Sequence, residues 1–272
     1  MFSTTKHVGK LVQCSRDSNG TTAHHPSLVS IPLNFTSYHL KCCLINAQSA
    51  KNKIAELHCL LATECYHILF LVETWFNETV ANALLLHGIP YNVYRRGRGD
   101  SRGGGIAIFY KKNVAITNMS VSNNVEALSF TISGKINVIL GYIPDGRDKL
   151  QIDSMCSFLR ASINPKMHNL ILGDFNMSYI DWLGHSVHNN LQQIFYDFVT
   201  DFGMKQLVSE PTRGNNILDL ILVDSDRVIY DTDVEEHFSN SDHNTVVFSI
   251  NCDYAAVSSV GLWVSVPEKG EL

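Results

Sequence analysis

The segment that most constrains the fold is 170–176, which reads Leu-Ile-Leu-Gly-Asp-Phe-Asn. Three apolar strand-forming residues run into a glycine, and an acid and an amide follow two positions apart. Because side chains alternate with a period of two along a strand, the pattern places Asp174 and Asn176 on one side of the chain. Ligands of α/β sheets usually bind at the carboxyl ends of strands, so we expect a site here. An ordinary turn is the alternative, because Asp and Asn also favour turns.

Short apolar runs alternate with amphipathic segments along the rest of the chain, which is typical of an α/β domain. Besides the central strand from 170, strands are predicted at 40–45, 68–72, 106–110, 114–116, 127–132, 136–142, 218–223 and 245–250. Helices are predicted at 50–61, 78–86, 150–163 and 191–202. The turn 133–135 indicates a hairpin. About nine or ten strands with four helices, in an order that mixes crossovers and hairpins, predict two mixed β-sheets packed face to face with helices outside.

Length and composition set the broad class. The 272 residues are 45% hydrophobic and 17% charged, which is enough to bury a large core. We expect a poorly ordered leader at 1–38, a folded domain at 39–251 and a tail at 252–272, since the two ends lack a sustained pattern. The sequence contains no membrane-span pattern and no secretory signal. We therefore expect an intracellular protein that is not secreted, with the nucleus as a candidate compartment.

The seven cysteines have no regular spacing, and we interpret them as free thiols of a reducing compartment. His58, Cys59 and Cys65 are the alternative, a metal site, but their spacing fits no zinc pattern.

Polar residues follow the predicted strands where the apolar runs end. Asn46, Glu73 and Tyr142 each stand at such a point, and each taken singly is equally typical of a cap or a turn. Asp219 differs, because apolar residues flank it and a buried carboxylate is costly without a partner. The segment 241–243, Ser-Asp-His, supplies an imidazole and a second carboxylate. An acid that orients a histidine while other acids hold a cation is a recurrent hydrolase arrangement.

The combined set contains the carboxylates Glu73, Asp174 and Asp242, the amides Asn46 and Asn176, and one His–Asp pair. Oxygen ligands with a single histidine favour Mg²⁺ or Mn²⁺ over zinc. Cleavage of a phosphate ester is the chemistry that uses such a set best.

Charge is unevenly distributed along the chain. A formal net charge of −5 argues against a protein that coats nucleic acid through bulk positive charge. Between positions 95 and 112, however, six basic residues accompany a single acid, Asp100. This basic strip suits a polyanion at one edge, and its candidate contacts are Arg95, Arg96, Arg98 and Arg102. A solvated loop without a binding role is the alternative.

These residues resemble the motifs of a known family. Asn46, Glu73, 142–144 (Tyr-Ile-Pro), 173–176, 218–220 (Leu-Asp-Leu) and 241–243 occur in the order and approximate spacing of the endonuclease/exonuclease/phosphatase superfamily. The longer phrases at 44–49, 73–75, 102–107 and 211–220 are similar to the endonuclease domain of LINE-type (non-LTR) retrotransposons. The resemblance extends over residues 39–251.

The resemblance implies a four-layer, DNase I-like α/β sandwich and a Mg²⁺-dependent DNA endonuclease that nicks one strand and leaves a 3′-hydroxyl. It also implies roles: Glu73, Asn46 and Asp242 as metal ligands, His243 held by Asp219 at the scissile phosphate, Asp174 at the attacking water, and Asn176 and Tyr142 as phosphate contacts. The general base is open between Asp174 and His243, and Ser241 is expected to support the site. We expect a monomer whose partner is DNA. The full-length element would continue into a reverse transcriptase, which these residues lack.

Two other functions stay open. Phosphatases of this superfamily that act on inositol phosphates or lipid head groups carry an Arg soon after the Gly-Asp-x-Asn motif and a Cys-Asp-Arg motif, whereas this chain has Met177 and Leu-Asp-Leu at 218–220. The second alternative is a catalytically silent, domesticated remnant that binds DNA or a protein.

Overall fold

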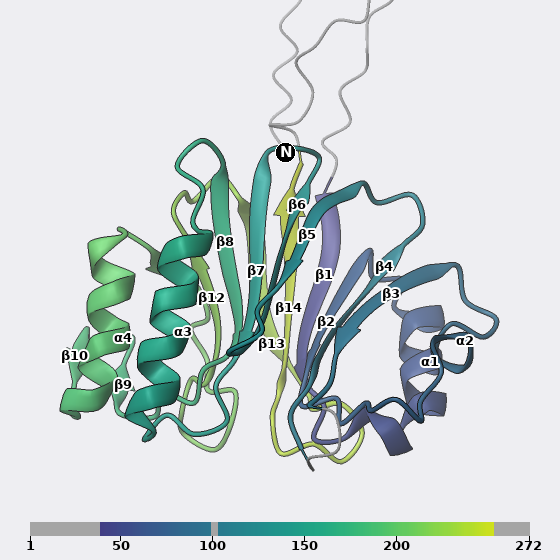
Figure 1. The fold of residues 1–272 in the computed structure, drawn as a ribbon, viewed down its shortest axis with the longest axis horizontal. Helices are drawn as coiled ribbons and strands as arrows, with labels where there is room; N and C mark the ends of the chain where they lie inside the picture. The colour runs from purple at the N-terminus through teal and green to yellow at the C-terminus, as the bar shows by residue number, and fades with distance from the viewer. Residues whose placement is uncertain (1–38, 99–102, 253–272) are drawn as a thin grey trace, which may run out of the picture. The chain divides into compact units, whose positions relative to one another are not determined.

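The computed structural model describes residues 39–98 and 103–252, which contain two six-stranded β-sheets (Figure 1). The predicted leader at 1–38, Arg102 and the predicted tail from 253 onward lie outside the described residues. Within the described ranges, no helix is long and apolar enough to cross a membrane.

The first sheet has the strand order β13-β14-β1-β2-β4-β3. Its strands are β1 (His39–Asn46), β2 (Ile68–Val72), β3 (Tyr91–Arg96), β4 (Ile106–Lys111), β13 (Ile229–Glu235) and β14 (Thr245–Asn251). β1 is parallel to β2, to which a crossover connects it, and antiparallel to β14 on its other side. Every residue of β2 is buried, as expected for a strand covered on both faces.

The second sheet has the order β11-β12-β8-β7-β6-β5 and, like the first, contains a parallel pair among antiparallel strands. Its strands are β5 (Ile116–Val121), β6 (Glu126–Ile132), β7 (Ile136–Tyr142), β8 (His168–Asp174), β11 (Lys205–Gln206) and β12 (Asp219–Val223). β7 and β8 are the parallel pair, and β6 and β7 form the predicted hairpin. A separate ribbon pairs β9 (Ile180–Asp181) with β10 (Ser186–Val187).

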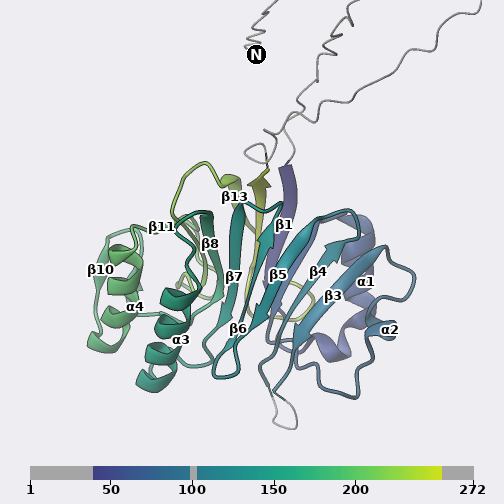
Figure 2. The same ribbon diagram turned by 45° about the horizontal axis from the view of Figure 1, so that its top comes forward.

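Helices cover the outer face of each sheet (Figures 1 and 2). The first sheet carries the 3-10 turn η1 (Ala50–Asn52), α1 (Ile54–Thr63) and α2 (Asn82–Leu85), and the second carries α3 (Lys149–Ser162) and α4 (Asn190–Asp201). The side chains of Asp148 and Asn189 cap α3 and α4 by accepting hydrogen bonds from backbone N–H groups of the first turn. Helix, sheet, sheet and helix form four layers, which confirms the predicted fold class.

Side-chain alternation along the central strands divides the core into three layers. Leu170 and Leu172 of β8 lie between the sheets, whereas Ile171 packs in the cluster formed with α3 and α4. On β2, Phe70 lies between the sheets and Leu71 packs in the cluster formed with α1. All five side chains are fully buried, and burial of each stabilises the fold by about 1.5–3 kcal/mol.

The structure corrects several predicted boundaries. The predicted helix 50–61 divides into η1 and α1, because Lys53 between them has a non-helical ψ of 28° at a φ of −124°. The predicted helix 78–86 shortens to α2, and the strand predicted at 114–116 begins at Ile116. No strand is predicted at β3 or β13. Both are edge strands with many polar residues, so neither has the apolar run of a buried strand.

Candidate active site

The predicted site residues gather at one end of the layer between the two sheets. Tyr142, Asp174 and Asp219 stand side by side on β7, β8 and β12, because the strand register pairs Asp174 with each of the other two. Asn46 ends β1 on the same face as Leu44, which belongs to the inter-sheet core. Strand alternation therefore directs polar side chains from both sheets to one place.

Three hydrogen bonds, each with one partner from either sheet, close this end of the layer. They are Asn46 Nδ2 to Asp174 Oδ2 (2.8 Å), Tyr142 Oη to Glu73 Oε1 (2.7 Å) and His243 Nδ1 to Asp219 Oδ2 (2.8 Å). Asn46, Glu73 and His243 lie at the ends of first-sheet strands, and their three partners lie on the second sheet. We call these contacts the three cross-sheet bonds. The site exists only where the two sheets meet.

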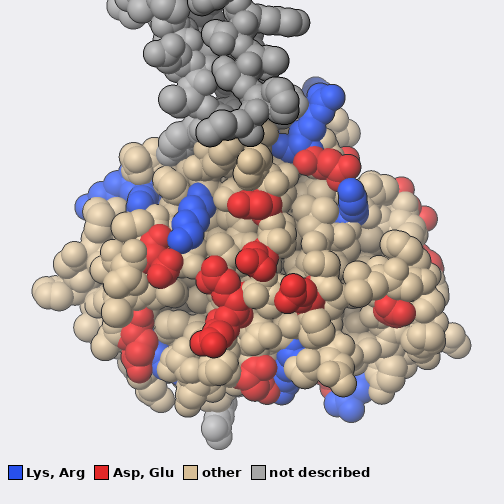
Figure 3. All heavy atoms as spheres, turned by 180° about the vertical axis from the view of Figure 1, so that it is seen from behind, with Lys and Arg blue, Asp and Glu red and all other residues tan. Residues whose placement is uncertain are grey.

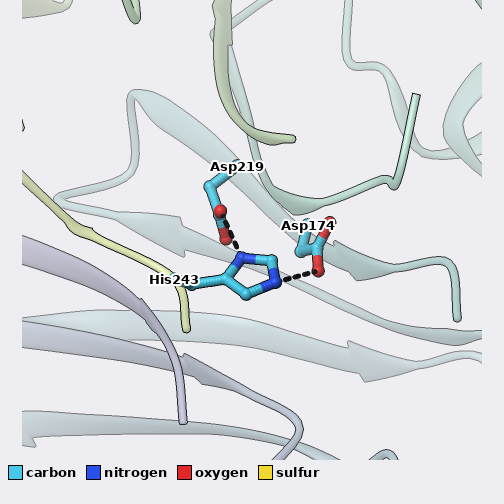
Figure 4. Close-up of side chains that lie close together, drawn as sticks. All are labelled: Asp174, Asp219 and His243. Carbon is cyan, nitrogen blue, oxygen red and sulfur yellow. Dashed lines mark hydrogen bonds and ion pairs between the residues drawn. The ribbon is translucent and has the colours of Figure 1, made fainter. Parts of the chain in front are cut away.

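His243 forms a fully buried pair with Asp219, and its other ring nitrogen is directed toward Asp174 (Figure 4). Its Nε2 lies 3.9 Å from Asp174 Oδ2 and 3.8 Å from Asp242 Oδ1. Burial lowers the pKa of His243, but the hydrogen bond and the charge of Asp219 outweigh it and the net pKa is raised. The contact with Asp219 therefore favours the protonated form of the ring despite its burial.

Ser241 supports the loop that carries His243. Its Oγ donates to the backbone oxygen of Asn46 at 2.7 Å and accepts the backbone N–H of His243 at 3.2 Å. Ser241 thus ties the His243 loop to the end of β1, as expected for a supporting residue.

Asp174 is fully buried next to Asp219. Loss of solvation raises the pKa of Asp174 well above its usual range, and the Asp219 charge raises it further, against the opposing effects of His243 and Asn46. Asp174 also accepts the backbone N–H of Asn176 at 2.9 Å and its side-chain amide at 3.3 Å. Asn176 has a positive φ of 53°, so a turn of the backbone, and not strand alternation, brings the two side chains together.

Glu73 lies in a tight turn directly after β2, with a positive φ of 52°. The next two N–H groups of that turn donate to the oxygens of Gly105 (3.1 Å) and Gly104 (2.9 Å), which hold the turn in place. Oε1 of Glu73 accepts from Asn46 at 3.1 Å and from Tyr142. Burial first, and the Glu73 charge second, raise the pKa of Tyr142, so its hydroxyl stays a donor to Glu73.

The donors at this site fit a divalent cation. Asp219 Oδ1 is buried and has no hydrogen-bond partner among the described residues, and the neighbouring carboxylates add negative charge. One atom from each of Asp174, Asp219 and His243 lies within 4.8 Å of the others, which is close enough to hold an ion. This trio is not the predicted ligand set of Glu73, Asn46 and Asp242. Within the trio His243 Nδ1 and Asp219 Oδ2 already bond each other, so the oxygen-only set suits a hard cation better.

The sequence does not predict two contacts of Asp242. The amide of Gln48 donates to Asp242 Oδ1, and the guanidinium of Arg213 lies 2.6 Å from Asp242 Oδ2. The only signal is that both residues fall within the family-like phrases 44–49 and 211–220. Thr212, in the second phrase, is fully buried and accepts the backbone N–H groups of residues 218 and 219 at 3.0 and 3.1 Å, which positions the start of β12.

The basic strip is largely occupied by contacts within the protein. Arg95 bonds Asn82 Oδ1 and two backbone oxygens of the segment 77–80. Arg96 donates to backbone oxygens at 123 and 125, and Arg98 pairs with Glu126. Arg95 and Arg96 belong to β3 and not to a loop. Their role as DNA contacts stays a prediction, as does that of Arg102, which lies outside the described residues.

Two clefts adjoin the site. One, of about 370 Å³, is lined by Tyr142, Arg98, Glu126 and the first turns of α3. The other, of about 540 Å³, is lined by residues that include Asn176, Arg147, Tyr179, Arg213 and Leu218, and we call it the Arg213 cleft. Each cleft is large enough to hold part of an extended polymer.

Comparisons with known proteins place the chain in a family. The family model described as "Endonuclease/Exonuclease/phosphatase family" matches residues 44–243. Comparison with curated proteins gives no match.

Solved structures share the fold. An AP endonuclease from Archaeoglobus fulgidus has a TM-score of 0.64 at 17% identity, covering 78% of this chain and 99% of that one. A variant of the 3′ phosphatase NExo from Neisseria, bound to a product DNA hairpin, gives 0.64 at 17%, covering 78% and 99%. The endonuclease domain of TRAS1, a telomere-specific non-LTR retrotransposon, gives 0.62 at 19%, covering 79% and 100%.

The fold is therefore that of nucleases and phosphatases with a DNase I-like architecture, and the resemblance to LINE-type endonuclease domains is supported. The matched family range contains every predicted metal and catalytic residue, from Asn46 to His243. The chain belongs to the endonuclease/exonuclease/phosphatase family.

Proposed function

We propose that this protein is a divalent-metal-dependent DNA endonuclease that hydrolyses a phosphodiester bond, nicks one strand and leaves a 3′-hydroxyl. The catalytic unit is residues 39–251, and Mg²⁺ is the expected metal, with Mn²⁺ as the alternative. The observation that carries the proposal is the three cross-sheet bonds, which gather a His–Asp pair, a buried acid and a glutamate in one place. The likeness to the TRAS1 endonuclease domain and to an AP endonuclease supports DNA as the substrate.

Each residue then has a defined task. Glu73, Asn46 and Asp242 hold the cation, which neutralises charge that develops on the phosphate when it is bound. His243, whose protonated form Asp219 favours, donates a hydrogen bond from Nε2 to a phosphate oxygen. Asp174 accepts the proton of the attacking water in its ionised form, and its raised pKa makes that carboxylate a stronger base. Of the two candidates for the general base, Asp174 thus faces the attacking water and His243 faces the phosphate. The bond from phosphorus to the 3′-oxygen breaks, and the departing 3′-oxygen takes a proton from solvent water to become the 3′-hydroxyl.

Tyr142 and Asn176 are the remaining predicted phosphate contacts. Tyr142 donates its single proton to Glu73, and Asn176 donates to the oxygen of Ile143 at 2.8 Å and to Asp174. Each side chain must therefore give up a hydrogen bond within the protein in order to donate one to the phosphate. Until then, Tyr142 holds Glu73 and Asn176 holds Asp174 in position.

The charge on one face helps to locate the DNA. Figure 3, seen from behind, shows acidic side chains across the middle of that face and most Lys and Arg side chains toward its margins. The exposed acids of the edge strand β13 are Asp231, Asp233 and Glu235. A polyanion is repelled by such surfaces, so we expect DNA at the strand ends beside the two clefts.

The test is nicking of supercoiled plasmid by purified protein with Mg²⁺ and with EDTA. Glu73→Ala and His243→Ala should each lower the rate by at least about 100-fold, the usual contribution of such groups. Matched controls are Glu78→Ala and His237→Ala, because both residues are exposed and outside the site. Equal nicking by all five proteins would mean that the activity comes from a contaminant.

The products separate the alternatives. A nick that DNA polymerase extends without prior phosphatase treatment carries a 3′-hydroxyl, as proposed. Phosphate release from a 3′-phosphorylated oligonucleotide or an inositol polyphosphate, without nicking, would replace the endonuclease with a phosphatase. DNA binding that EDTA does not weaken, without cleavage under any divalent metal, would identify a silent remnant. Monomeric elution and a nuclear location in cells are further expectations.

A further inference from the structure

Arg213 contacts Asp242, one of the predicted metal ligands, at the edge of the Arg213 cleft. Its Nη2 and Nε lie 2.6 and 2.9 Å from the same atom, Oδ2 of Asp242. The other oxygen, Oδ1, accepts a hydrogen bond from the amide of Gln48, and the Gln48 oxygen accepts the backbone N–H of Asp242 at 3.1 Å. Both carboxylate oxygens of Asp242 therefore already have donors.

The backbone near Arg213 is anchored, whereas its side chain is half exposed. Arg213 and Asn216 exchange backbone hydrogen bonds of 3.1 and 3.0 Å, which closes a tight turn. The backbone N–H of Asn244 donates to the oxygen of Thr212 at 2.7 Å, so the turn is fixed to the loop that carries Asp242. The Arg213 and Asp242 side chains are 45% and 49% exposed. The guanidinium can therefore change partner without movement of the main chain.

A divalent cation and a guanidinium repel each other when they share one carboxylate oxygen. An ion pair as exposed as Arg213 and Asp242 is weak, so a metal ion can displace the guanidinium. The displaced group has an open volume beside it, because Arg213 lines the cleft of about 540 Å³ together with Arg147, Asn176 and Tyr179. A planar guanidinium in such a cleft is well suited to bind phosphate.

We propose that Arg213 is a positioning residue that alternates between two anions: Asp242 before the metal binds, and a DNA phosphate in the Arg213 cleft afterwards. The inference rests on the proposed function, in which Asp242 is a metal ligand. It makes metal and DNA binding cooperative, because the ion releases the group that the phosphate needs.

The first measurement is Mg²⁺ binding without DNA, by titration calorimetry. The matched control is Arg147→Gln, because Arg147 lines the same cleft and forms its own exposed pair with Asp145. Arg213→Gln should bind Mg²⁺ about two- to five-fold more tightly than wild type, as expected from removal of a weak competing ion pair. Arg213→Lys should bind Mg²⁺ with an affinity between those of Arg213→Gln and wild type, because a lysine still competes for Asp242. Arg147→Gln should bind Mg²⁺ as wild type does. Equal or weaker Mg²⁺ binding by Arg213→Gln would overturn the proposal.

The second measurement is the affinity for a short fluorescent DNA duplex, with Mg²⁺ and with EDTA. A His243→Ala background slows cleavage, by the expected factor of about 100 or more, so that binding can be measured. In this background, Arg213→Gln should weaken DNA binding in Mg²⁺ but have little effect in EDTA, because Asp242 then holds the guanidinium. Arg147→Gln should have the same effect in both conditions. An Arg213→Gln loss that is equal with and without Mg²⁺ would contradict release by the metal.

The two proposals fail in different ways. A wild-type protein that binds no Mg²⁺ would overturn the proposed function and this inference with it. A wild-type protein that binds Mg²⁺ and nicks DNA, while Arg213→Gln leaves both binding measurements unchanged, would overturn the inference alone.

Discussion

Replacement of Asp219 by Asn tests the buried His–Asp pair most directly. The two side chains are each 1% exposed, and their contact is 2.8 Å, so solvent cannot substitute for the lost charge. Asn preserves the shape of Asp219 but removes its negative charge. We expect the substitution to lower the pKa of His243, because the hydrogen bond and charge of Asp219 are what raise it against the effect of burial.

The size of the change follows from the contact. A hydrogen bond to a charged group contributes about 1.5–3 kcal/mol. Loss of this bond withdraws stabilisation of that size from the protonated ring, so the pKa of His243 should fall. Less protonated His243 at neutral pH means a weaker phosphate contact, so nicking at pH 7.5 should fall by about 100-fold or more.

Stability should change with pH in a defined direction. In the wild type the pKa of His243 is raised above 6.5, so its contribution to stability is complete below pH 6.5 and is lost as pH rises through the folded-state pKa. In Asp219→Asn this contribution disappears. The difference in unfolding free energy between the two proteins should therefore be largest below pH 6.5 and shrink as the pH rises through the folded-state pKa of His243.

Nitrogen NMR of the imidazole ring reports the pKa of His243 without reference to activity, and urea unfolding at several pH values reports stability. The control is Asp226→Asn, because Asp226 is exposed and lies beyond the other end of β12. A His243 pKa that stays the same or rises in Asp219→Asn would refute the reasoning, whatever happens to the nicking rate.

Two further substitutions test the supports of the site. Gly173→Ala should prevent folding, because Gly173 has a φ of 141° and an added Cβ would lie 1.8 Å from the oxygen of Gly141. In the control Gly203→Ala the added Cβ meets no atom within 4 Å, so this substitution should cost only about 1–2 kcal/mol. Soluble yield and urea unfolding compare the two variants. Thr212→Val should destabilise the protein by at least about 2 kcal/mol in urea, because two buried N–H groups lose their acceptor. Thr200→Val, whose hydroxyl bonds only its own helix, should leave stability within about 0.5 kcal/mol of wild type.

The central strands could be predicted because burial on both faces leaves a continuous apolar run. The predicted strands 68–72 and 136–142 coincide with β2 and β7 at both ends. β13 could not be predicted, because it pairs on one side only and exposes most of its side chains, which are polar. A single-sequence pattern reports burial, so a strand that is not buried gives no signal.

The same reasoning separates the parts of the site. Asn46, Tyr142 and Asp174 could be predicted, because each ends an apolar strand. The contact between Gln48 and Asp242 could not, because 194 positions separate the two residues and Gln48 has a positive φ of 40° in an irregular segment. Local spacing says which side chains reach a strand end, but it does not say which loops meet there.

Because the three cross-sheet bonds join the two sheets, the proposed activity depends on how the sheets are aligned with each other. A slip of one sheet against the other by a single residue, about 3.3 Å, would break all three contacts at once. Neither sheet supplies the proposed catalytic residues alone, because His243 lies at the end of a first-sheet strand and its partner Asp219 belongs to the second sheet. During mild heating, the nicking activity should therefore be lost when the contacts between the two sheets loosen, before the strands within each sheet separate.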